Sequence, residues 1–163
     1  MDEKLYEQIG ARTGGDIYIG VVGPVRSGKS SFIKRFMELL VLPNIPESGM
    51  RMRATDELPQ SAAGRTIMTT EPKFVPEKAV PITLEDGGTL RCRLIDCVGY
   101  MVQGTVGHEE NQKPRMVKSP WFEKEIPFDQ AAETGTRKVI TEHSTIGVLV
   151  TTDGTISDIP REN

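Results

Sequence analysis

The residues best suited to chemistry lie in one short stretch, residues 23–30 (GPVRSGKS). This stretch fits the pattern G-x-x-x-x-G-K-[ST] without a mismatch, which is typical of a loop that binds phosphate. Its glycines let backbone N–H groups turn toward an anion, and the N-terminus of a following helix adds positive potential. We expect Lys29 to meet the β- and γ-phosphates and Ser30 to ligate Mg²⁺. The residues of this region expected to contact the nucleotide are Gly23, Arg26, Ser27, Gly28, Lys29, Ser30 and Ser31.

An aspartate at the end of an apolar run is the second candidate. Residues 93–99 (RLIDCVG) end in the pattern D-x-x-G. An acid at the end of a strand beside a phosphate loop holds Mg²⁺, usually through water, and the glycine N–H binds the γ-phosphate. An isolated D-x-x-G more often marks an ordinary turn after a strand, but its position downstream of a phosphate loop favours the metal role. We therefore expect Asp96 to hold the metal and Gly99 to contact the nucleotide.

A threonine pair within residues 66–72 (TIMTTEP) is the third candidate. P-loop GTPases use a threonine from the corresponding loop to ligate Mg²⁺ and to sense the γ-phosphate. Thr70 is the first choice for this role and Thr69 the second, while the alternative is that the pair merely starts a strand. The residues expected to act in catalysis are Lys29, Asp96, Thr70 and Thr69, and the expected metal ligands are Ser30, Thr70 and Asp96.

The elements that must position these residues begin with a strand and a helix. Residues 16–23 (DIYIGVVG) are β-branched and apolar, which predicts a strand buried on both faces of a parallel sheet. Residues 30–40 show helical spacing of apolar side chains, and Pro43 is expected to end the helix. The side chains expected on its buried face are Phe32, Ile33, Phe36, Met37 and Leu40.

Two irregular stretches are predicted, with a hairpin between them. Residues 43–76 are rich in proline and read as a long loop like switch I of GTPases. Residues 79–84 and 89–96 are strand-like runs joined by a D-G-G turn, which predicts antiparallel neighbours. A second irregular stretch is expected over residues 97–128, and the switch II-like loop is taken as residues 96–128.

The last predicted elements are a helix and a strand. Asp129 is expected to cap a helix that runs to about Glu142, with Ala132, Val139 and Ile140 inward. Residues 146–150 (IGVLV) are expected to form a strand. This order predicts an α/β fold of the P-loop NTPase class, a GTPase-like (TRAFAC-type) three-layer domain of which residues 1–163 form the N-terminal part. Because the usual later strands are missing and IGVLV is too apolar for an exposed sheet edge, we expect a longer natural protein.

Composition limits the class of protein. The chain has 163 residues, 37% of them hydrophobic and 26% charged, so one soluble globular domain is expected. Its net charge of −3 gives no broad basic surface, and no nucleic-acid partner is expected. The sequence has no apolar run long enough for a membrane span, and its acidic start is unlike a signal peptide, so we expect no transmembrane segment and a cytosolic location.

The cysteines and histidines are interpreted as structural. Cys92 and Cys97 have opposite parity in the predicted strand, so they are expected to be buried on opposite faces without forming a disulfide. Their spacing with His108 and His143 does not indicate a zinc site.

Five blocks of the sequence, together with these motifs, closely resemble the N-terminal region of the stage IV sporulation protein A family, the spore-coat morphogenetic ATPases of endospore-forming bacteria. Together the blocks span nearly the whole chain, and they are far more distinctive than a bare phosphate loop. The blocks are residues 15–45, 56–76, 93–100 (RLIDCVGY), 135–140 (GTRKVI) and 142–156 (EHSTIGVLVTTDGTI).

This resemblance implies a GTPase-like domain that binds and hydrolyses ATP with Mg²⁺ and uses the energy for self-assembly. The assembly would be the coat basement layer, built in the mother-cell cytoplasm on the outer forespore membrane. The family's P-loop lysine corresponds to Lys29, its Walker B acid to Asp96, and its sensor threonines to Thr69 and Thr70. The implied partners are further copies of the protein in a polymer, a small amphipathic membrane-anchoring peptide and other coat proteins.

The residues leave two alternatives open. GTPases read guanine with an N-K-x-D set that does not occur here, so the preference for ATP comes from the resemblance alone. Tyr100 directly follows Gly99, where Ras-like enzymes place a water-positioning glutamine, which predicts slow intrinsic hydrolysis unless water is positioned otherwise. Arg26 is a candidate for stabilising charge on the phosphates. The alternatives are a regulatory GTPase-type switch and a structural coat protein with an idle nucleotide site.

Overall fold

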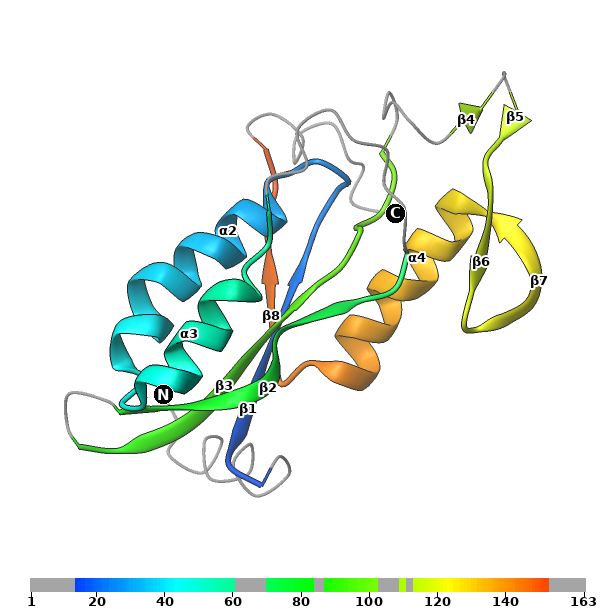
Figure 1. The fold of residues 1–163 in the computed structure, drawn as a ribbon. Helices are drawn as coiled ribbons and strands as arrows, with labels where there is room; N and C mark the ends of the chain where they lie inside the picture. The colour runs from blue at the N-terminus through cyan, green and yellow to red at the C-terminus, as the bar shows by residue number, and fades with distance from the viewer. Residues whose placement is uncertain (1–13, 61–69, 84–86, 103–108, 111–112, 153–163) are drawn as a thin grey trace.

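The computed structural model of the protein describes residues 14–60, 70–83, 87–102, 109–110 and 113–152. Within these residues the main sheet has the strand order β2-β3-β1-β8 (Figure 1). Strand β1 runs parallel to β3 and β8, whereas β2 is antiparallel to β3. The fold is therefore mixed α/β, as expected. The strands are β1 (Asp16–Val22), β2 (Lys73–Thr83), β3 (Thr89–Asp96) and β8 (Ile146–Leu149).

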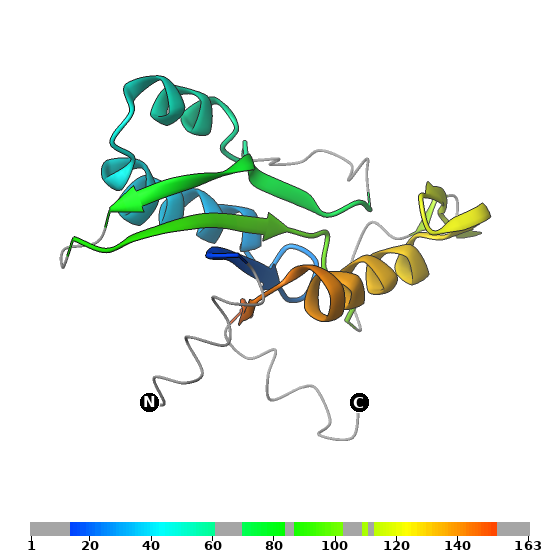
Figure 2. The ribbon, with the colours of Figure 1, turned by 90° about the horizontal axis from the view of Figure 1, so that it is seen from below.

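Helices cover both faces of this sheet. Helices α2 (Lys29–Phe36) and α3 (Ser48–Asp56) lie on one face and α4 (Phe128–Lys138) on the other (Figure 2). Val21 and Val22, neighbours at the end of β1, belong to the two different cores, because successive strand residues point to opposite faces. The sequence expectation of a strand buried on both faces is thus confirmed at this end of β1.

Helix α2 continues into a π-helix, η1 (Met37–Val41), and a 3₁₀ turn, η2 (Leu42–Asn44). The expectation that Leu40 is buried was wrong, since 53% of it is exposed, whereas Val41 is 1% exposed. A π-helix has more residues per turn than an α-helix, so the position that meets the core shifts by one residue. Pro43 lies within η2 instead of ending the helix.

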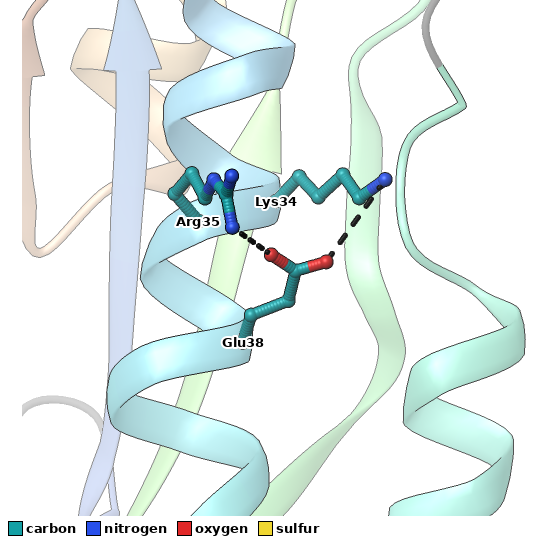
Figure 3. Close-up of polar contacts among 3 residues, drawn as sticks. All are labelled: Lys34, Arg35 and Glu38. Carbon is teal, nitrogen blue, oxygen red and sulfur yellow. Dashed lines mark hydrogen bonds and ion pairs between the residues drawn. The ribbon is translucent and has the colours of Figure 1, made fainter.

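A small ion-pair group joins the end of α2 to the start of η1 on their exposed side (Figure 3). Glu38 lies 3.1 Å from the Arg35 guanidinium and 3.9 Å from the Lys34 ammonium. Such exposed pairs one helical turn apart each contribute about 0.5 kcal/mol or less. The buried face therefore stabilises this helix more than its charges do.

The expectation of a continuous loop over residues 43–76 was wrong. Helix α3 forms within it, and β2 begins at Lys73, before the expected start. The prolines of this stretch flank the helix, so its hydrogen bonds remain intact. Ala54 is buried in the core, and the Arg51 guanidinium donates a 2.6 Å hydrogen bond to the Ile45 carbonyl. Packing on β2 thus stabilises a helix where the sequence pattern predicted a loop.

The expected hairpin is confirmed, with Thr83 paired to Thr89 across its turn. The stretch 97–128, expected to be irregular, contains short antiparallel strands instead. In the second pair, Met116 is paired with Pro127 and Val117 with Ile126, and the turn contains the Trp121 N–H···Ser119 Oγ contact of 3.5 Å. The strands are β4 (Glu109–Glu110) with β5 (Lys113–Pro114) and β6 (Met116–Ser119) with β7 (Phe122–Pro127).

Helix α4 begins at Phe128 with Pro127 at its N-cap, so the expected cap at Asp129 was wrong by two residues. The Asp129 carboxylate accepts a hydrogen bond from the Gln130 N–H. Ala132 and Val139 are buried, as expected. The expectation for Ile140 was wrong: it is 53% exposed, because the helix widens into the π-helix η3 (Val139–His143).

Both cysteines are free and buried, Cys92 in the core under α2 and Cys97 in the core under α4, so their expected placement on opposite faces is confirmed. Burial raises the pKa of Cys92 to about 11. The His143 ring packs edge-on against Phe74, and His108 lies outside the described residues.

The expected strand at IGVLV forms as β8, which lies at the edge of the described sheet with Ile146 42% and Leu149 59% exposed. The expectation of a longer natural protein, which was based on this apolar edge, stays a prediction. Among the residues that the structure describes, no helix has the length and apolar character needed to cross a membrane.

Candidate functional site

The glycine-rich loop lies between β1 and α2, the place that its sequence pattern requires. Gly28 has a φ of +92° and Arg26 a φ of +65°, so the backbone turns sharply twice within the loop. Gly28 is also the N-cap of α2 and contributes no side-chain cap, and the first turn of α2 contains no acidic residue. The N–H groups at this helix end are therefore not capped by a side chain and match an anion.

Lys29 is folded into the loop and is only 4% exposed. Its ammonium donates a 2.7 Å hydrogen bond to the Pro24 carbonyl, which also accepts the Ser27 N–H at 3.2 Å. Burial lowers the pKa of Lys29, while the neighbouring Cys97 and Asp96 act in the opposite direction. The cation thus lies inside the loop, where low polarity strengthens its attraction for an anion.

Asp96 ends β3 beside the start of α2, and the Ser30 hydroxyl donates a 2.6 Å hydrogen bond to its Oδ2. Its Oδ1 is buried and has no hydrogen-bond partner in the described part of the chain. Burial raises the pKa of Asp96, whereas the Ser30 hydrogen bond and the charges of Lys29 and Lys73 lower it. The structure therefore brings together two of the three expected metal ligands.

The segment after β3, which contains Gly99 and Tyr100, lies against the glycine-rich loop. The Val25 N–H donates to the Tyr100 carbonyl at 2.9 Å, and the Tyr100 N–H donates to the Gly23 carbonyl at 3.3 Å. Gly99 has a φ of +94°, and a Cβ there would collide with the Gly23 carbonyl oxygen and the Lys29 ammonium. A glycine is thus needed here for close packing, a reason that the motif alone did not reveal.

Of the two threonines, only Thr70 lies in the described residues. It is 3% exposed, and its Oγ1 has no hydrogen-bond partner in the part of the chain that the structure covers. Its carbonyl oxygen lies against Gly135 of α4, on the face of the sheet opposite α2. The expected role of Thr70 at the metal therefore stays a prediction.

Sequence reasoning missed Lys73, which pairs with Asp96 in the register of β2 and β3. The register shifts between Val75 and Val80, so counting back from the hairpin would have placed Pro76 opposite the aspartate. The charge of Lys73 lowers the pKa of Asp96. No signal in the sequence reports such a bulge.

The fold and the site together define a mixed α/β domain in which a glycine-rich loop and a strand-end aspartate meet, which is consistent with an ATPase domain. Residues 1–163 match the family described as "Stage IV sporulation protein A, ATPase domain", and the chain belongs to this family. The resemblance carried by the sequence blocks is thereby confirmed.

Curated relatives named "Stage IV sporulation protein A" agree with this assignment. The chain is 64% identical over 159 residues to the protein of Bacillus anthracis, an alignment that covers 98% of the chain and 32% of the relative. It is 63% identical to the protein of Bacillus subtilis (strain 168), with the same coverage, and 55% identical to that of Clostridioides difficile (strain 630), covering 100% of the chain and 33% of the relative. The chain thus spans about one third of the length of these relatives. No solved structure matches it.

Proposed function

We propose that this chain is a P-loop, GTPase-like (TRAFAC-type) domain that binds ATP with Mg²⁺ and hydrolyses it. The observation that carries the proposal is the 2.6 Å hydrogen bond between Ser30 and Asp96. In P-loop NTPases the loop Ser/Thr and the Walker B aspartate hold the same Mg²⁺, so they lie next to each other. The same pair is adjacent here.

The residues present fit a metal-bound phosphate group. Asp96 Oδ1 and Ser27 Oγ are buried without hydrogen-bond partners among the described residues, so both retain capacity to bind a ligand. Hydroxyl and carboxylate oxygens are the ligand types that Mg²⁺ prefers. Ser30 and Asp96 would hold the ion, with Thr70 as the further ligand, and the ion would neutralise and orient the phosphates.

Lys29 and the N-terminus of α2 would bind the phosphates themselves. The Pro24 carbonyl engages one donor of the Lys29 ammonium, which leaves two N–H donors for phosphate oxygens. The uncapped N–H groups after Gly28 add backbone donors. Gly99 keeps room for the ammonium, since a side chain there would meet it.

We extend the proposal to the whole protein on the printed name of its relatives. The domain would act in sporulation in the mother-cell cytoplasm, where its ATP cycle drives self-assembly of the coat basement layer at the forespore surface. Its partners would be further copies of itself, a small amphipathic anchoring peptide and other coat proteins. This part rests on the family, because the chain spans about one third of its relatives.

Calorimetric titration with ATP and with GTP, each with Mg²⁺, tests the proposal together with a phosphate-release assay. We expect ATP to bind at least about tenfold more tightly than GTP, a difference of about 1.4 kcal/mol, and to be hydrolysed slowly. Tighter binding of GTP would favour a regulatory GTPase. Tight ATP binding with no phosphate release would favour a coat protein with an idle site.

A further inference from the structure

Gly135, in the last turn of α4, is a point of close approach. A Cβ at this position would lie 2.9 Å from the Thr70 carbonyl oxygen and 3.0 Å from Trp121 Cη2. Both distances are too short for an undisturbed contact with a methyl group. Glycine inside a helix is unfavourable relative to alanine, and Gly135 has an ordinary helical conformation, so the close approach explains its presence. We call Gly135 and Trp121 the α4 seat.

The Thr70 hydroxyl makes no hydrogen bond in this position among the described residues. It is also buried. A buried hydroxyl without a partner is destabilising compared with one that is satisfied by a ligand or water. Among the described residues, the contact that holds Thr70 in the α4 seat is its packing against Gly135. A ligand that satisfies the Thr70 hydroxyl outside the seat would favour its departure.

The same turn of α4 also contacts the end of β3. Thr136, next to Gly135, places its Oγ1 3.8 Å from the Sγ of Cys97, and Cys97 directly follows Asp96. The Cys97 thiol donates to the Val21 carbonyl at the end of β1. One helical turn thus contacts both the segment before β2 and the strand end that carries the expected metal ligand.

We infer that Gly135 is a positioning residue: the α4 seat holds Thr70 in the nucleotide-free protein, and binding of a nucleoside triphosphate with Mg²⁺ releases it. The inference rests on the proposed nucleotide site. Thr70 then exchanges packing against Gly135 for a partner for its hydroxyl, and the population shifts toward the released state. The role of Gly135 is to permit the held state, since any side chain there displaces the Thr70 backbone.

Trp121 is the single tryptophan of the 163 residues and reports directly on the seat. The experiment follows its emission in the full protein during titration with a non-hydrolysable ATP analogue and Mg²⁺, and calorimetry measures binding in parallel. The spectrum of Trp121→Phe is subtracted, so that any other fluorophore cancels. We expect the emission to change with the same midpoint as the calorimetric titration.

Gly135→Ala tests the seat without nucleotide. Its Trp121 emission should already be shifted before nucleotide is added, and the further change on binding should fall to less than about half that of the parent protein, with affinity within about threefold. Gly49→Ala in α3 is the matched control. A Cβ there meets only the Glu47 carboxylate at 3.6 Å, an ordinary contact, so emission should remain unchanged.

Thr70→Val provides a test that does not depend on the folding of Gly135→Ala. It keeps the shape of the side chain and removes the unpartnered hydroxyl, so it should stabilise the held state. The midpoint of the emission change should lie at a several-fold higher nucleotide concentration than in Thr70→Ala, which loses the same hydroxyl together with the buried methyl group. A midpoint equal to or lower than that of Thr70→Ala would overturn the inference.

The remaining outcomes separate the inference from the proposed function. Calorimetric binding by the parent protein with unchanged Trp121 emission overturns the inference and leaves the nucleotide site intact. Emission of Gly135→Ala identical to that of the parent protein also overturns the inference alone. Absence of calorimetric binding overturns both.

Discussion

The Ser30 hydroxyl donates a 2.6 Å hydrogen bond to the carboxylate of Asp96, a residue 66 positions further along the chain. The contact follows from the parallel pairing of β1 and β3, in which Val21 lies opposite Asp96. Parallel strands end at the same edge of a sheet, so the loop after β1 and the acid that ends β3 meet there. The expected phosphate-binding and metal-binding residues therefore share one place in the fold.

We expect Lys29→Ala to weaken ATP binding by about 10- to 100-fold, because charge-assisted hydrogen bonds to phosphate are each worth about 1.5–3 kcal/mol. Lys34→Ala, on the same helix, removes an exposed ammonium 3.9 Å from Glu38 and should leave affinity unchanged. Calorimetric titration measures both. An affinity of Lys29→Ala within twofold of the parent protein would contradict the assigned role of the lysine.

We expect Asp96→Asn to bind ATP within a few-fold of the parent protein and to lose most Mg²⁺-dependent phosphate release, by about 100-fold or more. The amide oxygen can still accept the Ser30 hydrogen bond, so the change removes mainly the charge that holds the metal. Asp16→Asn, at the other end of the β1–β3 pair, is the control. Normal turnover of Asp96→Asn would place the metal ligand elsewhere.

We expect Thr70→Ala to bind ATP within about threefold and to release phosphate about 100-fold more slowly, because a misaligned phosphate reduces turnover more than binding. Thr69→Ala should have the smaller effect, since Thr70 is the first choice for the sensor. Phosphate-release assays at saturating ATP check both variants. The reverse order of effects would assign the role to Thr69.

We expect Gly99→Ala to destabilise the protein by about 2–4 kcal/mol, the range of backbone strain combined with a steric clash. Its Cβ would meet the Gly23 carbonyl and the Lys29 ammonium. Gly87→Ala is the matched control, since Gly87 has a φ of +84° and nothing within 4 Å of its Cβ, and it should cost only about 1–2 kcal/mol of strain. Urea unfolding measures both, and equal losses would contradict the clash.

The pH dependence of stability should reveal the buried carboxylate. Burial raises the pKa of Asp96 above the ordinary 3.8, so the folded protein binds this proton more tightly than the unfolded chain. The stability that Asp96 contributes is fully present when the pH is below its ordinary pKa, that of the unfolded chain. It is lost as the pH rises through the raised pKa of the folded protein. Asp96→Asn should therefore increase the thermal midpoint at pH 7 without Mg²⁺ or nucleotide, and the gain should shrink as pH approaches 3.8. A lower midpoint at pH 7 would contradict this.

The sequence by itself determined the features that depend on neighbouring residues. The apolar run over residues 16–22 predicts β1, the glycine-rich loop and the helical spacing after it predict the turn into α2, and the hairpin between β2 and β3 follows from its turn residues. Local sterics and hydrophobic periodicity act over a few residues, so they can be read without the fold.

Only the tertiary structure decided the features that depend on packing between distant segments. Helix α3 forms because Ala54 is buried in the core, and Leu40 is exposed because α2 widens into a π-helix. The bulge in β2 places Lys73 opposite Asp96, and the approach of Thr70 to Gly135 joins segments on either side of β3. Each of these features depends on the register of a helix or strand against its neighbours. A shift of that register by one residue would turn different side chains toward the core, and only the close packing of the whole core selects one register over the next.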